Sequence, residues 1–224
     1  IKAKLDIPKT QKKLQLLIES DGEDDTKQTS ISETAEKQDQ SLALRFIQLN
    51  TKLLRINTDA GIRFRNSQID PFARLRFRYL IEKEKWAFRI TENIFWFESD
   101  GAGETTRLDM DRRLTKKLLF RSTTQATWKN INHYFDTGQD LIIFQNINKH
   151  KSLAYQLGSR GTIDSRADPQ TYATDYFLSV RYRQQIHNKW LFLDVIPSIN
   201  HPRENDYKPV RSITLKLEIV FDAR

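Results

Sequence analysis

The chain has 224 residues, of which 29% are charged and 11% are aromatic, with no cysteine and a formal net charge of +8. No stretch approaches the roughly 18 consecutive apolar residues of a transmembrane helix, and the mean hydropathy is −0.66, so helical membrane spans are excluded. The absence of cysteine excludes disulfides, thiolate metal sites and cysteine nucleophiles.

Apolar and polar residues alternate along most of the chain, which predicts long β-strands and almost no helix. About thirteen segments show this alternation. In chain order they lie near residues 1–7, 13–20, 41–49, 53–65, 71–82, 86–98, 104–113, 117–128, 136–147, 151–163, 174–186, 190–200 and 211–221. The acidic stretch 21–40 has no periodicity and is predicted to be a mobile loop. Because no linker divides the chain, residues 1–224 are predicted to form a single domain.

The connections between these segments fall into two classes that alternate along the chain. Tight turns are predicted at 50–52, 83–85, 114–116, 148–150 and 187–189, and the other connections are longer and rich in turn-forming or acidic residues. This alternation is expected of an up-and-down meander whose two ends face different environments. In a soluble sheet the apolar face would form the core, whereas in a membrane barrel it would meet lipid and the charged face would line or fill the interior.

Three features favour the membrane barrel. Several segments keep the alternation for about 10 to 13 residues, and roughly 9 to 11 residues of a tilted strand span a bilayer. Trp86 and Trp96 share a face and are expected about 25 Å apart along the membrane normal, which is the height of the band between two aromatic girdles. Closure also removes the exposed edges of so wide a sheet. The candidate girdle residues are Trp86, Trp96, Trp128, Trp190, Tyr176 and Tyr182.

The sequence therefore predicts an all-β fold, a transmembrane antiparallel up-and-down β-barrel with a polar, arginine-rich interior. A soluble β-sandwich and a periplasmic β-solenoid are the alternatives. Glu92 does not fit the barrel pattern, because its position in the alternation points it at lipid. Either a β-bulge turns it inward or it contacts a bound partner. Residues 136–147 are also ambiguous, since Leu141-Ile142-Ile143-Phe144 has no clear face.

Three stretches resemble a known family. They are FWFESDGAGETTRLDMDRRL at 95–114, YFLSVRYRQQIHNKWLFLDVIPSINHPRENDY at 176–207 and the closing ITLKLEIVFDAR. On these motifs the chain resembles a family of uncharacterised proteobacterial outer-membrane β-barrel proteins, which are porin-like and have no established activity. The resemblance covers most of the chain. It implies a barrel in the outer membrane of a Gram-negative cell envelope and implies no chemistry.

The end of the chain also resembles the insertion signal recognised by the barrel-assembly machinery, in which alternating apolar residues close on an aromatic, here Phe221. That machinery is therefore an expected partner. The family usually has a strand before the one at 2–7, and single-chain bacterial barrels have even strand numbers. We therefore expect a first strand upstream and a total of about fourteen, with about twelve as the alternative.

By analogy the C-terminal strand ends in the periplasm. The tight turns are then periplasmic, and the longer loops, including 21–40, are extracellular.

If the apolar face is outside, arginine dominates the interior. The predicted lumen-lining residues are Arg45, Arg55, Arg63, Arg65, Arg74, Arg76, Arg78, Arg89, Arg107, Arg121, Arg181 and Arg183, with Arg160 and Lys216 on the same side. The acidic residues expected against them are Glu19, Asp59, Asp109, Asp111, Asp194 and Glu218. One function that fits is a passive channel whose arginine wall favours anions. The other is a non-conducting barrel, filled by ion pairs, that anchors another cell-envelope protein through Glu92 and residues 136–147.

Other functional classes are not expected. The four histidines are His133, His150, His187 and His201. None has a nearby serine in a nucleophile setting, so the chain is not expected to be an enzyme. Asp109 and Asp111 share a face, but the arginines around them indicate ion pairs rather than a calcium site, and no cofactor is expected. Basic residues recur on nearly every strand, which disfavours a nucleic-acid groove and leaves membrane lipid and lipopolysaccharide phosphates as the expected anionic neighbours.

Overall fold

The structure is a computed structural model, and it describes residues 2–6, 13–20, 40–65, 68–131, 134–164, 171–187 and 190–219. These residues form one sheet of thirteen antiparallel strands, in which each strand pairs with the next along the chain. The strands are β1 (Lys2–Asp6), β2 (Leu14–Ser20), β3 (Gln40–Asn50), β4 (Leu54–Arg65), β5 (Gln68–Lys83), β6 (Trp86–Phe97), β7 (Gly101–Arg113), β8 (Leu118–Lys129), β9 (Tyr134–Asn148), β10 (Lys151–Asp164), β11 (Thr171–His187), β12 (Leu191–Pro202) and β13 (Val210–Ile219). The short 3₁₀ turn η1 (Arg203–Asn205) joins the last two. No helix in the described part of the chain is long and apolar enough to cross a membrane.

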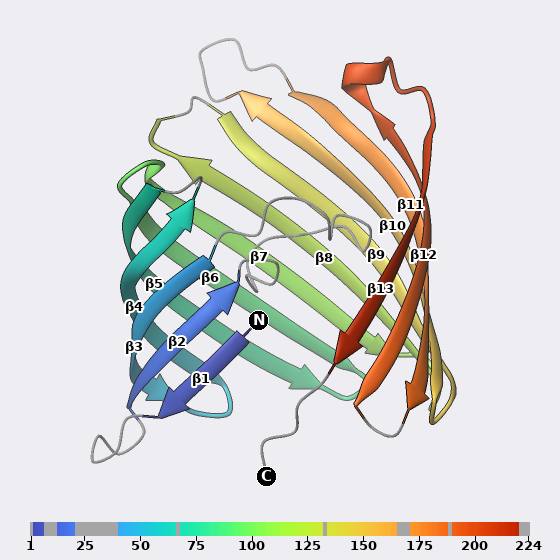
Figure 1. Ribbon diagram of the computed structural model, residues 1–224, viewed down its shortest axis with the longest axis horizontal. Helices are drawn as coiled ribbons and strands as arrows, with labels where there is room; N and C mark the ends of the chain where they lie inside the picture. Colours follow the sequence, from blue (N-terminus) through green and yellow to red (C-terminus); the bar gives the residue numbers. More distant parts are fainter. Residues whose placement is uncertain are drawn as a thin grey trace.

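The predicted all-β, up-and-down architecture is confirmed, because the thirteen predicted segments are the thirteen strands and they pair in sequence order. The sheet curls round until its two edge strands, β1 and β13, face each other across the front of the molecule (Figure 1). Among the described residues these two strands do not pair with each other. The structure therefore shows a strongly curled meander, and the closed barrel of about fourteen strands stays a prediction.

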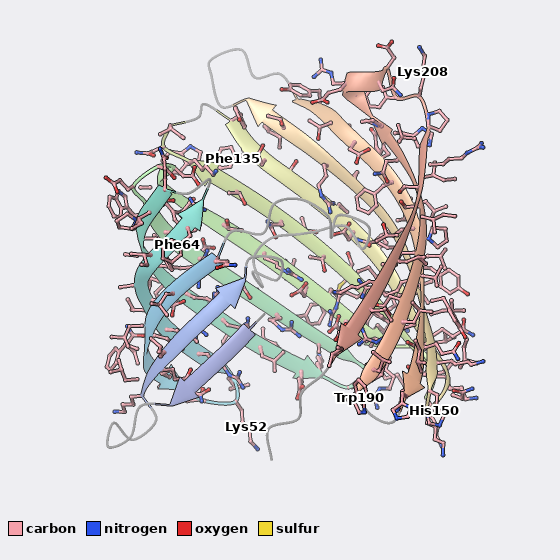
Figure 2. The ribbon with its side chains drawn as sticks, viewed as in Figure 1. Lys52, Phe64, Phe135, His150, Trp190 and Lys208 are labelled. Atoms are coloured by element: carbon pink, nitrogen blue, oxygen red, sulfur yellow. The ribbon has the colours of Figure 1, made fainter. Side chains whose placement is uncertain are left out.

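Short turns gather at one end of the sheet. The β3–β4 turn is closed by a hydrogen bond from the Thr51 backbone N–H to the Leu54 carbonyl at 2.9 Å. In the β5–β6 turn Glu84 has a φ of 54°, the left-handed conformation that such tight turns use. At the β9–β10 turn, the backbone N–H of His150 donates to Asn148 Oδ1 at 2.8 Å. Lys52 and His150 lie at this lower end, whereas Phe135 and Lys208 lie at the upper end (Figure 2). The predicted turn at 187–189 extends outside the described residues.

The two faces of the sheet have opposite chemistry. Asp59 is 0% exposed and Asp194 is 1% exposed, whereas Ile213 and Leu215 are 73% and 69% exposed. A single curled sheet has no second layer on its convex side, so the buried side chains lie on the concave side and the exposed apolar ones on the convex side. This is the reverse of a soluble antiparallel sheet, in which the apolar face is the buried one.

Register resolves the ambiguous segment 136–147. Leu141 and Ile143 are both 40% exposed and lie on the convex side. Ile142 points the other way, and with Phe144 it packs against Ala154 and Ile196 on the concave side. The four consecutive apolar residues thus serve both faces, which is why the sequence pattern showed no preferred side.

Candidate functional site

The concave face carries a series of ion pairs between neighbouring strands. The most buried one centres on Asp59 of β4, which stands directly opposite Arg45 on β3 and Arg74 on β5. The Arg45 guanidinium donates to both carboxylate oxygens of Asp59, at 2.6 and 2.7 Å. Arg74 donates to Asp59 Oδ2 through Nε at 3.1 Å and through Nη2 at 2.8 Å. A single carboxylate therefore joins three strands by charge-assisted hydrogen bonds.

A second group of ion pairs lies near the β4–β5 and β6–β7 connections. Arg63 Nε donates to Asp70 Oδ2 at 3.0 Å, and Arg63 Nη2 lies 3.1 Å from Asp100 Oδ2. The Ser99 backbone N–H donates to the other oxygen of Asp70 at 2.9 Å. The Arg63 guanidinium also stacks over the Phe97 ring, 4.1 Å from its centroid. This group ties the loop after β6 to β4 and β5.

The paired aspartates of β7 are surrounded by arginine, as the sequence predicted. Arg121 makes a bidentate pair with Asp111, at 2.6 and 2.8 Å. Asp109 accepts a hydrogen bond from Arg107 Nε at 3.0 Å and from the Thr123 hydroxyl at 2.7 Å. These contacts account for the carboxylates, and no cluster of three metal-ligating side chains occurs among the residues searched, which are those the structure describes.

The strands on the other side of the sheet carry the same kind of pair. Arg160 lies 3.1 Å from Asp140, across β10 and β9. Arg183 of β11 reaches Asp194 at 3.6 Å and Glu218 at 3.0 Å, so it bridges β12 and β13. Ion pairs on the concave face therefore extend from β3 to β13.

Arginines gather on one part of the concave face. On β5, Arg76 and Arg78 follow Arg74 at alternate positions. Arg76 stands between Asn57 on β4 and Asn93 on β6, and Arg78 stands beside Arg55. We call Arg55, Arg76 and Arg78 the basic cluster.

The predicted lumen residues differ in burial. Four arginines of the concave face are buried, namely Arg45, Arg63, Arg74 and Arg76. The partly buried ones are Arg78, Arg89, Arg107, Arg121, Arg160, Arg181 and Arg183, and with them Lys216. Arg55 is exposed at the tight-turn end, and the side chains of Arg65 and Glu19 lie outside the described residues. The structure thus places the described members of the set on one face and pairs several of them with acid.

Sequence reasoning missed several acidic members of this face, among them Asp70 and Asp140. Asp70 lies in β5, which begins at Gln68, whereas the predicted segment begins at residue 71. Asp140 lies in the segment whose faces could not be distinguished. The sequence analysis also did not predict that aromatic rings share the concave face. Phe95 and Phe177 are only 8% and 3% exposed. Position in the alternation would have found Phe177, which has the same parity as Arg181 and Arg183.

Most of the predicted girdle residues lie near the two ends of the strands. Trp86 begins β6 and stacks on Phe88, with ring centroids 5.9 Å apart, and Arg112 lies over its ring. Trp96 and Tyr176, near the opposite end, are 48% and 49% exposed. The remaining three candidates are Trp128 near the end of β8, Trp190 beside the start of β12 and Tyr182 within β11. Trp190 lies at the lower end in Figure 2.

Glu92 faces the convex side. The register of β6 is unbroken on both sides of it, with Phe77 opposite on β5 and Thr106 opposite on β7. The proposed β-bulge is therefore absent, and this explanation of Glu92 was wrong. The Thr106 hydroxyl donates to Glu92 Oε2 at 2.7 Å.

Comparison with known proteins gives one weak structural likeness. No family model matches the chain, and no curated protein matches it. Among solved structures it is similar to the NanC porin, with 11% identity over 82% of this chain and 94% of that one and a TM-score of 0.49. A likeness at this level carries no argument about this chain, so the family resemblance stays a prediction.

Proposed function

We propose that the chain is an integral outer-membrane β-barrel that forms a passive channel favouring anions. The observation that carries the proposal is the inverted arrangement of the faces. Charged side chains such as Asp59 and Arg45 are buried on the concave side, and large apolar side chains such as Leu215 and Leu217 are more than half exposed on the convex side. Lipid is the surrounding in which such a convex face is stable.

The proposal includes closure of the sheet. An open edge in the hydrocarbon layer would leave backbone N–H and C=O groups without partners, which costs several kcal/mol each, so a spanning sheet must close. About fourteen strands would satisfy the even number of single-chain bacterial barrels. Phe221 of the proposed insertion signal and the loop segment 21–39 lie outside the described residues. In this proposal lipopolysaccharide surrounds the barrel rim, and the long loops face outward from the cell.

The anion preference is proposed from the basic cluster. Arg55, Arg76 and Arg78 bring three positive charges together on the adjacent strands β4 and β5. A section of wall with this charge attracts anions and repels cations.

Conductance in planar bilayers tests this function. We expect ohmic channels whose reversal potential in a salt gradient shows anion preference. Arg76→Glu combined with Arg78→Glu should shift that potential toward cation preference. Lys116→Glu, in the exposed β7–β8 turn, is the matched control and should change it far less. Complete absence of conductance from folded protein would eliminate the channel, and an unchanged reversal potential in the double variant would eliminate the role of the basic cluster.

The second candidate is a non-conducting barrel that anchors another envelope protein. The network of ion pairs favours it, because Arg45, Asp59 and Arg74 fill space on the concave face and pair with one another. Co-purification of a stoichiometric second protein with electrically silent barrels would support it.

We propose no catalytic role for the chain. The described histidines make local contacts: His150 Nδ1 lies 3.0 Å from Gln185 Oε1, and His201 Nδ1 lies 2.8 Å from the Tyr207 carbonyl oxygen. The His187 ring packs edge-on against Trp190 with centroids 5.5 Å apart. His133 lies outside the described residues.

A further inference from the structure

The convex face is not uniformly apolar. On β5 the convex positions from Ile69 to Ile81 are all apolar, as are those of β12 from Leu191 to Ile199 and those of β13 from Ile213 to Ile219. On β6 to β10, in contrast, polar residues occupy neighbouring convex positions. We call this set the polar patch; its members are Glu92, Thr106, Ser122, Thr124, Thr137, Gln139 and Ser159.

The polar patch is continuous and internally hydrogen-bonded. Thr106 donates to Glu92, Thr124 donates to Gln139 Oε1, and Gln139 Nε2 donates to Ser122 Oγ at 2.9 Å. On most of its strands the patch has apolar residues on either side. On the tight-turn side these are Ile90, Leu108, Phe120, Leu141 and Leu157, and on the other side Ile94, Ala126, Phe135 and Ile163. On β7 the exposed Glu104 follows Thr106 on that other side. On four of its five strands the patch therefore lies within the apolar band rather than at its rim.

Contact between the polar patch and lipid would be energetically unfavourable. Glu92 Oε1 is buried and has no hydrogen-bond partner among the described residues. A carboxylate in the apolar band is costly, and ionisable side chains there usually face protein or water. Hydroxyl and amide side chains both donate and accept hydrogen bonds, so a surface built from them can be complementary to itself.

We propose that the polar patch is the docking surface for a second copy of this chain, side by side in the membrane. The inference rests on the proposed membrane location. All copies insert with the same orientation, so the axis relating two of them runs along the membrane normal. Such an axis keeps every residue at its own depth, and the patch of one copy meets the patch of the other. A single continuous patch that meets itself gives a two-fold dimer.

The shape of the surface fits this partner. Ala126 and Gly161 lie among the patch residues, directly beside Thr137 on either side. Small residues let two membrane-embedded surfaces approach closely enough for hydrogen bonds between them.

Cysteine cross-linking in native membranes tests the dimer, since the chain contains no cysteine of its own. Thr124→Cys and Ser159→Cys place a thiol in the patch. Thr58→Cys places one on the convex side of β4, outside the patch, and is the matched control. After mild oxidation, we expect a product of twice the monomer mass from at least one patch variant and monomer alone from Thr58→Cys.

Three results would overturn the dimer. They are monomer alone from both patch variants, equal cross-linking of Thr58→Cys, and a cross-link from the patch to a different protein. Outer-membrane fractionation and the heat-dependent gel shift of folded barrels are measured on the same samples. If these fail, the proposed location fails and the dimer with it. If they succeed without a patch cross-link, only the dimer fails.

Discussion

Asp59 shows how individual residues hold the charged face together. Its side chain is fully buried, and Arg45 and Arg74 both donate to it. Removing one member of a buried ion pair leaves an uncompensated charge, which typically costs about 3 to 5 kcal/mol. Here two guanidinium groups, on the strands either side of β4, would be left to repel each other.

We therefore expect Asp59→Ala to lower the free energy of unfolding by about 3 to 5 kcal/mol, measured by urea titration in lipid vesicles. Lys208→Ala is the control, because it removes an ion pair with Asp206 at 3.9 Å whose side chains are 72% and 88% exposed. Exposed pairs contribute little, so this variant should unfold like the unmodified protein. Equal stability of Asp59→Ala would show that the ion pair is not a structural determinant.

At the scale of the strands, close backbone approach limits what the concave face accepts. Gly61 of β4 pairs with Ala43 of β3. A Cβ on Gly61 would collide with the Leu42 carbonyl oxygen and lie 2.6 Å from the Ala43 Cα. These are backbone atoms of the neighbouring strand, so the collision cannot be relieved by turning a side chain, and the β3–β4 pairing must shift.

Gly61→Ala should accordingly reduce the folded fraction severalfold, as seen by the heat-dependent shift of the folded band on gels. Gly161→Ala is the matched substitution, since its new Cβ would lie 3.0 Å from the Tyr172 carbonyl oxygen and 3.3 Å from Thr137 Oγ1. Shifts of a few tenths of an ångström would accommodate it, so it should fold nearly normally. If both variants fold equally well, close approach of β3 and β4 is not a constraint.

At the scale of the whole molecule, the question is which solvent surrounds the convex face. Leu215 on the convex side and Thr214 on the concave side are consecutive residues of β13. In water, an arginine at a site as exposed as Leu215 would be tolerated. In a bilayer, arginine on the lipid side of a barrel costs roughly 2 to 4 kcal/mol near the midplane.

Leu215→Arg should thus lower the free energy of unfolding in vesicles by roughly 2 to 4 kcal/mol, and Thr214→Arg should change it far less. The comparison keeps the strand and the introduced charge the same and changes only the face. Tolerance of Leu215→Arg with loss of stability in Thr214→Arg would contradict the membrane proposal.

Much of the fold follows from the alternation along the chain. Its period of two places Arg74, Arg76 and Arg78 on one face and Leu75 and Phe77 on the other, whatever the strands pair with. The alternation predicts the ends of the strands less accurately than their middles. For example, β5 begins three residues before the predicted segment and so includes Asp70. Near a strand end such as Asp70, the alternation continues for too few residues to show whether they belong to the strand or to the turn.

The register was not accessible from the sequence. Irregularities in pairing occur at Ile47/Leu49, Lys151/Ser152, Arg160/Gly161 and Gln185/His187, and each changes which residues meet across the strands beyond it. The bulge expected at Glu92 is absent, and Glu92 instead joins polar neighbours on the convex side.

By itself, the sequence determined that strands form, how they alternate and which side of each strand is charged, because these depend only on neighbours along the chain. The tertiary structure decided which carboxylate each arginine meets and that the polar residues of β6 to β10 join into one patch. Those residues are far apart in sequence: Arg45 meets Asp59 across 14 residues and Arg63 meets Asp100 across 37. Such partners are brought together only by the lengths of the turns and the pairing of whole strands, which alternation leaves open.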